Sequence, residues 1–153
     1  MAARYLAGRL MATRLDAVQR STRVALRFEA SDGDYAVATY ADGNRNGVRT
    51  REIADGTDPA LLAGERLGEH FAGVRFGLGP GVPDLDGVRE VDPSDGVRVG
   101  SARILTLSPD GTATSGTLYI RGRRGQYAVR VLGATARTRM FQYHAGAGAW
   151  IAR

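Results

Sequence analysis

The opening segment of the chain is the feature that most constrains its fold. Residues 2–21 predict a helix about 30 Å long. On a helical wheel the apolar side chains gather on one broad face, formed by Ala3, Leu6, Ala7, Leu10, Met11, Ala17 and Val18. Arg9, Thr13 and Asp16 fall opposite, while Arg14 lands inside the apolar face, where its long stem is tolerated. Such a helix cannot bury its apolar face by itself, so it must pack on other structure.

Period-two alternation follows the helix and predicts strands. Residues 23–29 alternate as a half-buried strand does, and residues 35–40 form a second run after the turn sequence Ser-Asp-Gly-Asp. This pair predicts an antiparallel hairpin. Further strands are expected at residues 103–107, 117–121, 127–132 and 137–143, with turns at residues 108–111 and 122–125. The predicted fold class is therefore α+β, with an N-terminal amphipathic helix packed on antiparallel β-sheet.

The length of 153 residues fits a single domain. We divide it into the helix (1–21), a first β-hairpin region (22–53), an irregular region (54–102) and a C-terminal β region (103–153). Within the irregular region, residues 54–73 allow a short helical turn around Leu61 and Leu62. Residues 79–100 are rich in Gly, Pro and Asp and show no period. A stretch of this kind in a compact domain is functional or mobile.

The net charge of the chain is +5, and its charged residues are distributed very unevenly along the sequence. Every Lys or Arg position is an arginine. Residues 1–27 carry a net +5, residues 28–110 a net −7, and residues 111–153 a net +7 because they hold seven arginines and no acid. A basic C-terminal third attracts polyanions or an acidic partner. The chain has no cysteine, which excludes disulfides and thiolate chemistry, and no apolar run of the length that a membrane helix needs.

Three stretches resemble GspH/FimT-type pseudopilins, the minor subunits of type II secretion pseudopili and type IV pili. Residues 13–20, Thr-Arg-Leu-Asp-Ala-Val-Gln-Arg, resemble the end of that family's long helix. The loop at residues 42–50, Asp-Gly-Asn-Arg-Asn-Gly-Val-Arg-Thr, resembles its Asp-x-Asn-x-Asn-Gly-Val loop. Residues 107–118 resemble its late hairpin. The resemblance implies a pilin-like globular head that assembles with other pilin-like subunits and performs no covalent chemistry.

The sequence departs from this family at its start. Family members open with a short leader cut before Phe-Thr-Leu-Ile-Glu, and an apolar half-helix follows; neither is present here. Met1 corresponds to a position near the middle of the family's long helix. With such a segment upstream, the expected location is the inner membrane and periplasm or a pilus. Without it, membrane insertion and pilin processing are excluded, and the chain as it stands is soluble.

The same resemblance points to a DNA-binding element. In FimT-like minor pilins of DNA uptake, a Gly-Arg-x-Arg element near the C-terminus is implicated in binding double-stranded DNA, and residues 136–139 here read Ala-Arg-Thr-Arg. Arg137 and Arg139 would share one face of a strand, which suits phosphate contacts. The tentative DNA-binding set is Arg121, Arg123, Arg124, Arg137 and Arg139, with Phe141 and Tyr143 as stacking platforms if exposed. The alternative is a solvated arginine-rich face.

The loop at residues 42–47 also has the opening spacing of an EF-hand calcium loop. The twelfth position, which needs a glutamate, is Ile53, and Glu52 comes one place early. Asx turns that stabilise the loop are the favoured interpretation, and calcium binding stays open.

Catalytic signals are weak, so we predict no enzyme, no cofactor, no metal and no small-molecule substrate. His70 and His144 are the only histidines, and neither has an obvious nucleophile nearby. Asp84 and Asp86 resemble a loose carboxylate pair, which in this Gly/Pro context favours loop solvation. The glycines at 77, 79 and 81 lack the following helix of a dinucleotide site. A third reading, an unrelated soluble β-rich binding domain, remains open beside the two pilin readings.

Overall fold

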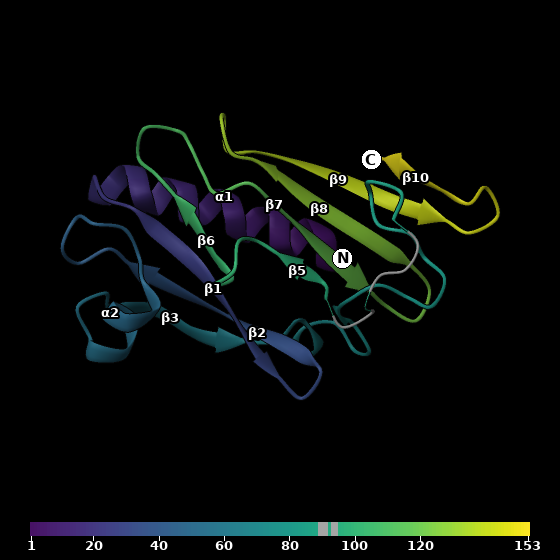
Figure 1. Cartoon of the computed structure of the whole chain (residues 1–153), viewed down its shortest axis with the longest axis horizontal. Helices are drawn as coiled ribbons and strands as arrows, with labels where there is room; N and C mark the ends of the chain where they lie inside the picture. Colours follow the sequence, from purple (N-terminus) through teal and green to yellow (C-terminus); the bar gives the residue numbers. More distant parts are fainter. Residues whose placement is uncertain (89–91, 93–94) are drawn as a thin grey trace.

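A computed structural model describes residues 1–88, 92 and 95–153 (Figure 1). Its elements, in chain order, are α1 (Ala2–Arg20), β1 (Val24–Ser31), β2 (Asp34–Ala41), α2 (Thr50–Asp55), β3 (Ala60–Glu65), the 3-10 turn η1 (Leu67–Glu69), β4 (Arg75–Phe76), β5 (Val97–Arg98), β6 (Ile104–Leu107), β7 (Gly116–Arg121), β8 (Gln126–Leu132), β9 (Arg137–His144) and β10 (Ala149–Ala152). The fold is α+β, as predicted. The prediction of irregular structure at residues 79–100 falls partly on residues 89–91 and 93–94, which lie outside the described ranges.

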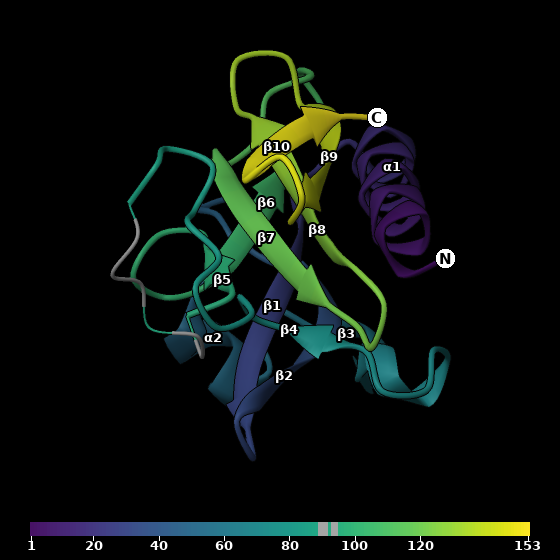
Figure 2. The same cartoon turned by 90° about the vertical axis from the view of Figure 1, so that its right-hand side faces the viewer.

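The described strands form two antiparallel sheets. One has the order β3-β2-β1-β6, and the other has the order β10-β9-β8-β7-β4, with β5 also paired to β7. Figure 1 shows α1 running lengthwise behind the strands of both sheets, and Figure 2 shows it to one side of them. Leu6 and Leu10 of α1 share one apolar core with Leu26 of the first sheet and Val129 of the second. The helix is therefore buried against both sheets at once.

The predicted turns have the backbone that their residues favour. Asp32 and Gly33 both have positive φ, 50° and 75°, between the paired residues Ser31 and Asp34. Two consecutive positive φ values define the two-residue hairpin turn that Asp-Gly favours. At residues 108–111 the Gly111 N–H donates to the Ser108 carbonyl at 3.1 Å. The sequence therefore located both chain reversals correctly.

The buried face of α1 differs from the predicted face. Thr13 is buried and Arg9 is nearly so, whereas Met11 and Val18 are exposed. Arg9 is tolerated inside because its guanidinium donates to Thr39 Oγ1 at 2.7 Å and pairs with Glu65 at 2.9 Å. The Thr13 hydroxyl donates to the Arg9 carbonyl at 2.7 Å. Because these polar groups are satisfied by hydrogen bonds, burying them costs less than hydropathy alone predicts.

The helical turn predicted around Leu61 and Leu62 is wrong, because these residues lie in β3. This edge strand pairs with β2 through an irregular register, and Leu62 is exposed. An exposed edge strand does not need alternating apolar and polar side chains, so no strand pattern is visible in these residues. The described residues contain one other α-helix besides α1, the six-residue α2. None of the helices in the described part of the chain combines the length and the apolar character that crossing a bilayer requires.

Candidate functional site

The outer face of the second sheet carries a row of arginines. Cross-strand partners lie on the same face of a sheet, and the register pairs Arg139 of β9 with Arg130 of β8, Arg130 with Thr117 of β7, and Thr117 with Arg98 of β5. We call Arg98, Arg130 and Arg139 the arginine row. Arg137, two residues from Arg139 on β9, lies on the same face. The sequence predicted the shared face of Arg137 and Arg139 but missed Arg130, which only the strand register brings beside them.

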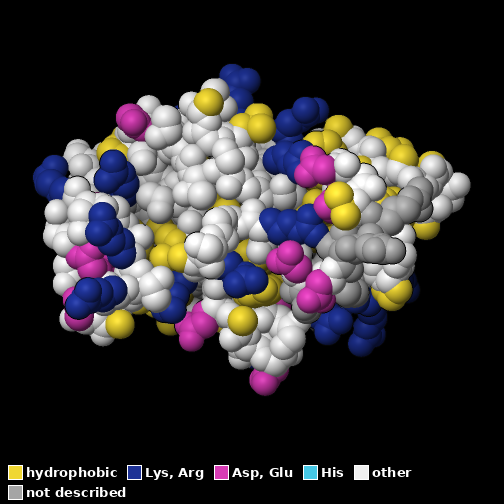
Figure 3. All heavy atoms as spheres, in the orientation of Figure 1, with side chains coloured by type: hydrophobic (Ala, Val, Ile, Leu, Met, Phe, Trp, Pro, Cys, Tyr) yellow, Lys and Arg dark blue, Asp and Glu magenta, His cyan; other side chains and the backbone are white. Residues whose placement is uncertain are grey.

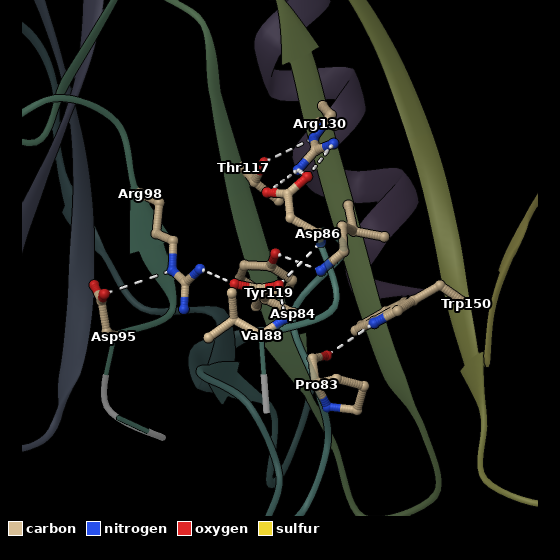
Figure 4. A network of polar contacts seen from close by, with 11 residues as sticks. Pro83, Asp84, Asp86, Val88, Asp95, Arg98, Thr117, Tyr119, Arg130 and Trp150 are labelled. Carbon is tan, nitrogen blue, oxygen red and sulfur yellow. Dashed lines mark hydrogen bonds and ion pairs between the residues drawn. The ribbon is translucent and has the colours of Figure 1, made fainter. Parts of the chain in front are cut away.

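An acidic segment covers part of this row (Figure 4). We call residues 83–88 the strap. Arg98 Nη1 pairs with Asp84 at 2.7 Å, and Arg130 Nη2 pairs with Asp86 at 3.3 Å. Arg98 also pairs with Asp95 at 3.5 Å. Figure 3 shows basic and acidic side chains interspersed on this face, next to the grey atoms. The expected solvation role is wrong for Asp84, which is buried and pairs with Arg98, whereas the Asp86 side chain is 68% exposed and also pairs with Arg130.

Asp84 is the internal anchor of the strap. It is 4% exposed, and its Oδ1 accepts the backbone N–H groups of Asp86 and Val88, each at 2.9 Å. Burial by itself raises the pKa of a carboxyl, but the hydrogen bonds from Arg98, Val88 and Asp86 outweigh it and lower the pKa of Asp84. The carboxylate is therefore charged throughout the neutral range and holds the strap to β5.

Two aromatic side chains complete the attachment of the strap. The Tyr119 hydroxyl accepts the Leu85 N–H at 3.0 Å, and Trp150 Nε1 donates to the Pro83 carbonyl at 2.9 Å. The Trp150 ring also packs on Tyr119 and Tyr143, with centroids 5.8 and 5.4 Å apart. Trp150 is thus a packing residue, and it connects β10 to the strap.

The five tentative DNA-binding arginines do not form one cluster. Arg137 and Arg139 start β9, whereas Arg123 and Arg124 occupy the β7–β8 turn at the far end of β8. The six-residue rise along β8 separates the two groups by about 20 Å. Arg121 lies on the same face as Arg139 but points a guanidinium N–H at the Leu78 carbonyl, 3.4 Å away. The structure brings together Arg137, Arg139 and Arg130 instead.

Arg137 and Arg139 are exposed, and within the described ranges neither has a carboxylate partner. The Arg139 guanidinium lies 5.5 Å from the centroid of the Phe141 ring. Phe141 belongs to a small apolar cluster with Tyr119 and Trp150, and Tyr143 packs on Trp150. Both predicted stacking rings therefore already have packing partners, so the positive charge of this surface is its available binding feature.

The calcium-like loop is held by its own backbone. Asp42 accepts the N–H groups of Asn44 and Gly47 at 3.2 and 2.7 Å. Asp58, which sequence reasoning did not single out, accepts those of Gly43 and Arg49, each at 2.9 Å. Both carboxylates are buried and committed to donors, which supports the Asx-turn interpretation. In the part of the chain that the structure describes, no three acidic, His or Cys side chains are grouped as metal ligands.

A second candidate surface is the outward side of α1. Met11, Leu15 and Val18 are 67, 57 and 52% exposed, and their spacing of four and three residues places them on one face. This outer stripe lies opposite the buried face of the helix. Exposed apolar residues scattered singly are ordinary on a monomer, whereas these three share one helical face, which makes that face a candidate contact surface.

His70 belongs to a cluster of side chains that connects α1 to β3. His70 Nε2 lies 2.7 Å from Glu65, which also accepts the Tyr5 hydroxyl and pairs with Arg9. Burial raises the pKa of Glu65, but its bonds to Tyr5, His70 and Arg9 outweigh burial and lower it. This cluster clamps α1 onto β3. Glu69 instead accepts the Arg66 N–H, so the adjacent Glu69 and His70 do not form a pair.

Comparison with protein-family models, with curated proteins and with solved structures found no match to this chain. The outer stripe of α1 and the arginine face of the second sheet are therefore the two surfaces that bear on function.

Proposed function

We propose that this protein is a structural subunit of a pilin-like assembly, a minor pseudopilin or minor pilin, in which the outer stripe of α1 packs against neighbouring subunits. The observation that carries this proposal is the two-sided character of α1. One side is buried against both sheets, while Met11, Leu15 and Val18 face outward. A helix that binds a sheet on one side and helices on the other needs apolar residues on both sides.

The grooves on either side of α1 fit the same interpretation. One lies between α1 and β3 and includes Ala12, Leu62 and Ala63. The other lies between α1 and the start of β9 and includes Met11 and Arg137. Small and apolar side chains beside the outer stripe give a neighbouring helix room to approach closely. The occupant that we propose is the helical stem of another pilin-like subunit.

Single cysteines test this contact, because the chain contains none of its own. Met11→Cys and Leu15→Cys, expressed from the native locus, should form disulfide adducts with neighbouring subunits under mild oxidation. Ala147→Cys is the matched control, since Ala147 is exposed in the β9–β10 turn, away from the outer stripe. Equal adduct formation at all three positions, or none at Met11 and Leu15, would contradict the proposal.

The nucleotide sequence upstream of the Met1 codon tests the pilin class itself. We expect it to encode, in frame, a leader ending before a Phe-Thr-Leu-Ile-Glu-like segment and an apolar half-helix continuous with α1. An in-frame stop immediately before Met1 would contradict the pilin interpretation and favour a β-rich binding domain of another class.

A second candidate function is binding of double-stranded DNA through Arg137 and Arg139. Two exposed guanidinium groups on one strand face support it, together with the backbone at Ala136, whose φ is 55°. Glycine is favoured at such a positive φ, so the position suits the Gly-Arg-x-Arg element that the sequence resembles. Contacts of this kind reach phosphates and are independent of base sequence.

Gel shifts with unrelated duplexes at about 50 and about 200 mM salt test this second function. Arg137→Ala combined with Arg139→Ala should weaken binding of every duplex and reduce its salt dependence. The matched control is Arg20→Ala combined with Arg51→Ala, which removes two exposed arginines elsewhere and the same total charge. Equal weakening by both double variants would mean that binding depends on net charge alone, and would contradict the assigned site.

A further inference from the structure

We propose that Arg130 is a third phosphate-binding residue beside Arg137 and Arg139, and that Asp86 is its resident counter-ion, which bound DNA must displace. This inference rests on the second candidate function. It adds a residue that the sequence pattern did not indicate, and it assigns a role to the strap.

The register fixes the position of Arg130. Arg130 lies directly opposite Arg139, and Leu132 of the same strand lies opposite Arg137. Directly opposed side chains start about 5 Å apart at Cβ, so the three arginines form one compact patch on the outer face. Like charges in direct opposition destabilise a sheet unless a counter-charge lies nearby. Asp86 supplies that counter-charge to Arg130.

Asp86 differs from Asp84 in a way that makes it displaceable. The Asp86 side chain is 68% exposed, and its closest approach to Arg130 is 3.3 Å. Exposed ion pairs of this length contribute little to stability. Asp84 is buried, and its shortest arginine contact is 2.7 Å. The Asp86 carboxylate can therefore rotate away from Arg130 while Asp84, Tyr119 and Trp150 keep the strap in place.

The guanidinium of Arg130 is already oriented by a hydrogen bond. Its Nε donates to Thr117 Oγ1 at 3.0 Å, so the guanidinium is held over the sheet while both terminal nitrogens face Asp86. A phosphate oxygen could replace the carboxylate at those nitrogens. The displaced Asp86 would remain close to the phosphate and repel it, so Asp86 should lower the affinity for DNA and favour only ligands with several phosphates.

The test measures the affinity of the full chain for a short random-sequence duplex by fluorescence anisotropy. We expect Asp86→Asn to bind about fivefold more tightly at about 50 mM salt, because no ion pair has to be broken and no carboxylate remains beside the bound phosphate. The salt slope should fall by about 0.9 in Arg130→Ala, the value for one phosphate contact fewer. Arg130→Ala should weaken binding, and Asp86→Asn combined with Arg130→Ala should show no gain over Arg130→Ala alone.

Glu29→Gln is the matched control. Glu29 is 67% exposed, pairs weakly with Arg27 at 3.9 Å in the other sheet, and its removal changes the net charge by the same amount. Equal gains in Asp86→Asn and Glu29→Gln, or a gain that persists without Arg130, would overturn the inference while leaving the Arg137 and Arg139 function intact. No binding by any variant at low salt would overturn both. Thermal melting of each variant checks that the fold is retained.

Discussion

Two loops of this protein have similar compositions and use their carboxylates differently. In the loop that begins at Asp42, the buried carboxylates of Asp42 and Asp58 accept only backbone N–H groups. In the strap, Asp84 divides its oxygens between backbone and Arg98, and Asp86 faces Arg130 from an exposed position. The first loop is closed on itself, whereas the second is bound to a charged sheet face.

Structural carboxylates differ from those available for binding in the groups that they neutralise or satisfy. A carboxylate that satisfies buried donors cannot leave without stranding them, and that costs more than an ordinary hydrogen bond contributes. A carboxylate that only neutralises an exposed arginine can be exchanged for another anion. By this criterion Asp58, Asp84 and Asp86 form a series of decreasing structural importance.

Asp58→Ala should give the largest loss of stability of the substitutions in these two loops. Asp58 is 1% exposed, and its removal leaves the N–H groups of Gly43 and Arg49 without their acceptor. We expect the free energy of unfolding to fall by about 3 kcal/mol, measured by urea denaturation. Asp55→Ala is the control, because Asp55 is exposed at the end of α2 and accepts one N–H, from Thr57. An equal loss of unfolding free energy in both variants would contradict the structural role that we assign to the buried carboxylate of Asp58.

Asp84→Asn should give an intermediate effect that depends on pH. Because folding lowers the pKa of Asp84, the charged carboxylate stabilises the protein above its unfolded pKa of about 3.9, and this contribution disappears as pH falls through the folded value. The variant should lose about 2 kcal/mol at neutral pH. The loss should shrink as the pH falls below about 4, which unfolding curves across that range would show. A loss independent of pH would indicate a packing role instead.

Calcium should have the smallest effect, close to none. The carboxylate oxygens of Asp42 already accept backbone N–H groups, and Glu52 accepts the side-chain amides of Asn44 and Asn46. Adding about 5 mM calcium, enough to fill even weak extracellular sites, should leave the melting temperature unchanged relative to EDTA. A calcium-dependent rise in melting temperature that Asp42→Asn abolishes would show that this loop binds cations after all.

The sequence located the regular elements well where local signals were strong. The helix, the Asp-Gly hairpin and the four later strands lie within a few residues of their predicted positions, because periodicity and turn residues act over short distances. The sequence failed at β3 and at the orientation of α1. In both cases a partner distant in the chain decided the outcome, since β3 is defined by its pairing with β2 and Arg9 is buried through Glu65.

The candidate site divides in the same way. That Arg137 and Arg139 share a face follows from strand alternation, which the sequence alone determines, and so does the basic character of the C-terminal third. Only the tertiary structure placed Arg130 opposite Arg139, moved Arg123 and Arg124 to the other end of β8, and laid the strap over the row. Strand register depends on how two segments pair, and the docking of the strap depends on contacts between segments far apart in the chain. Local propensities do not encode those contacts, because each requires two surfaces that exist only after both segments have folded.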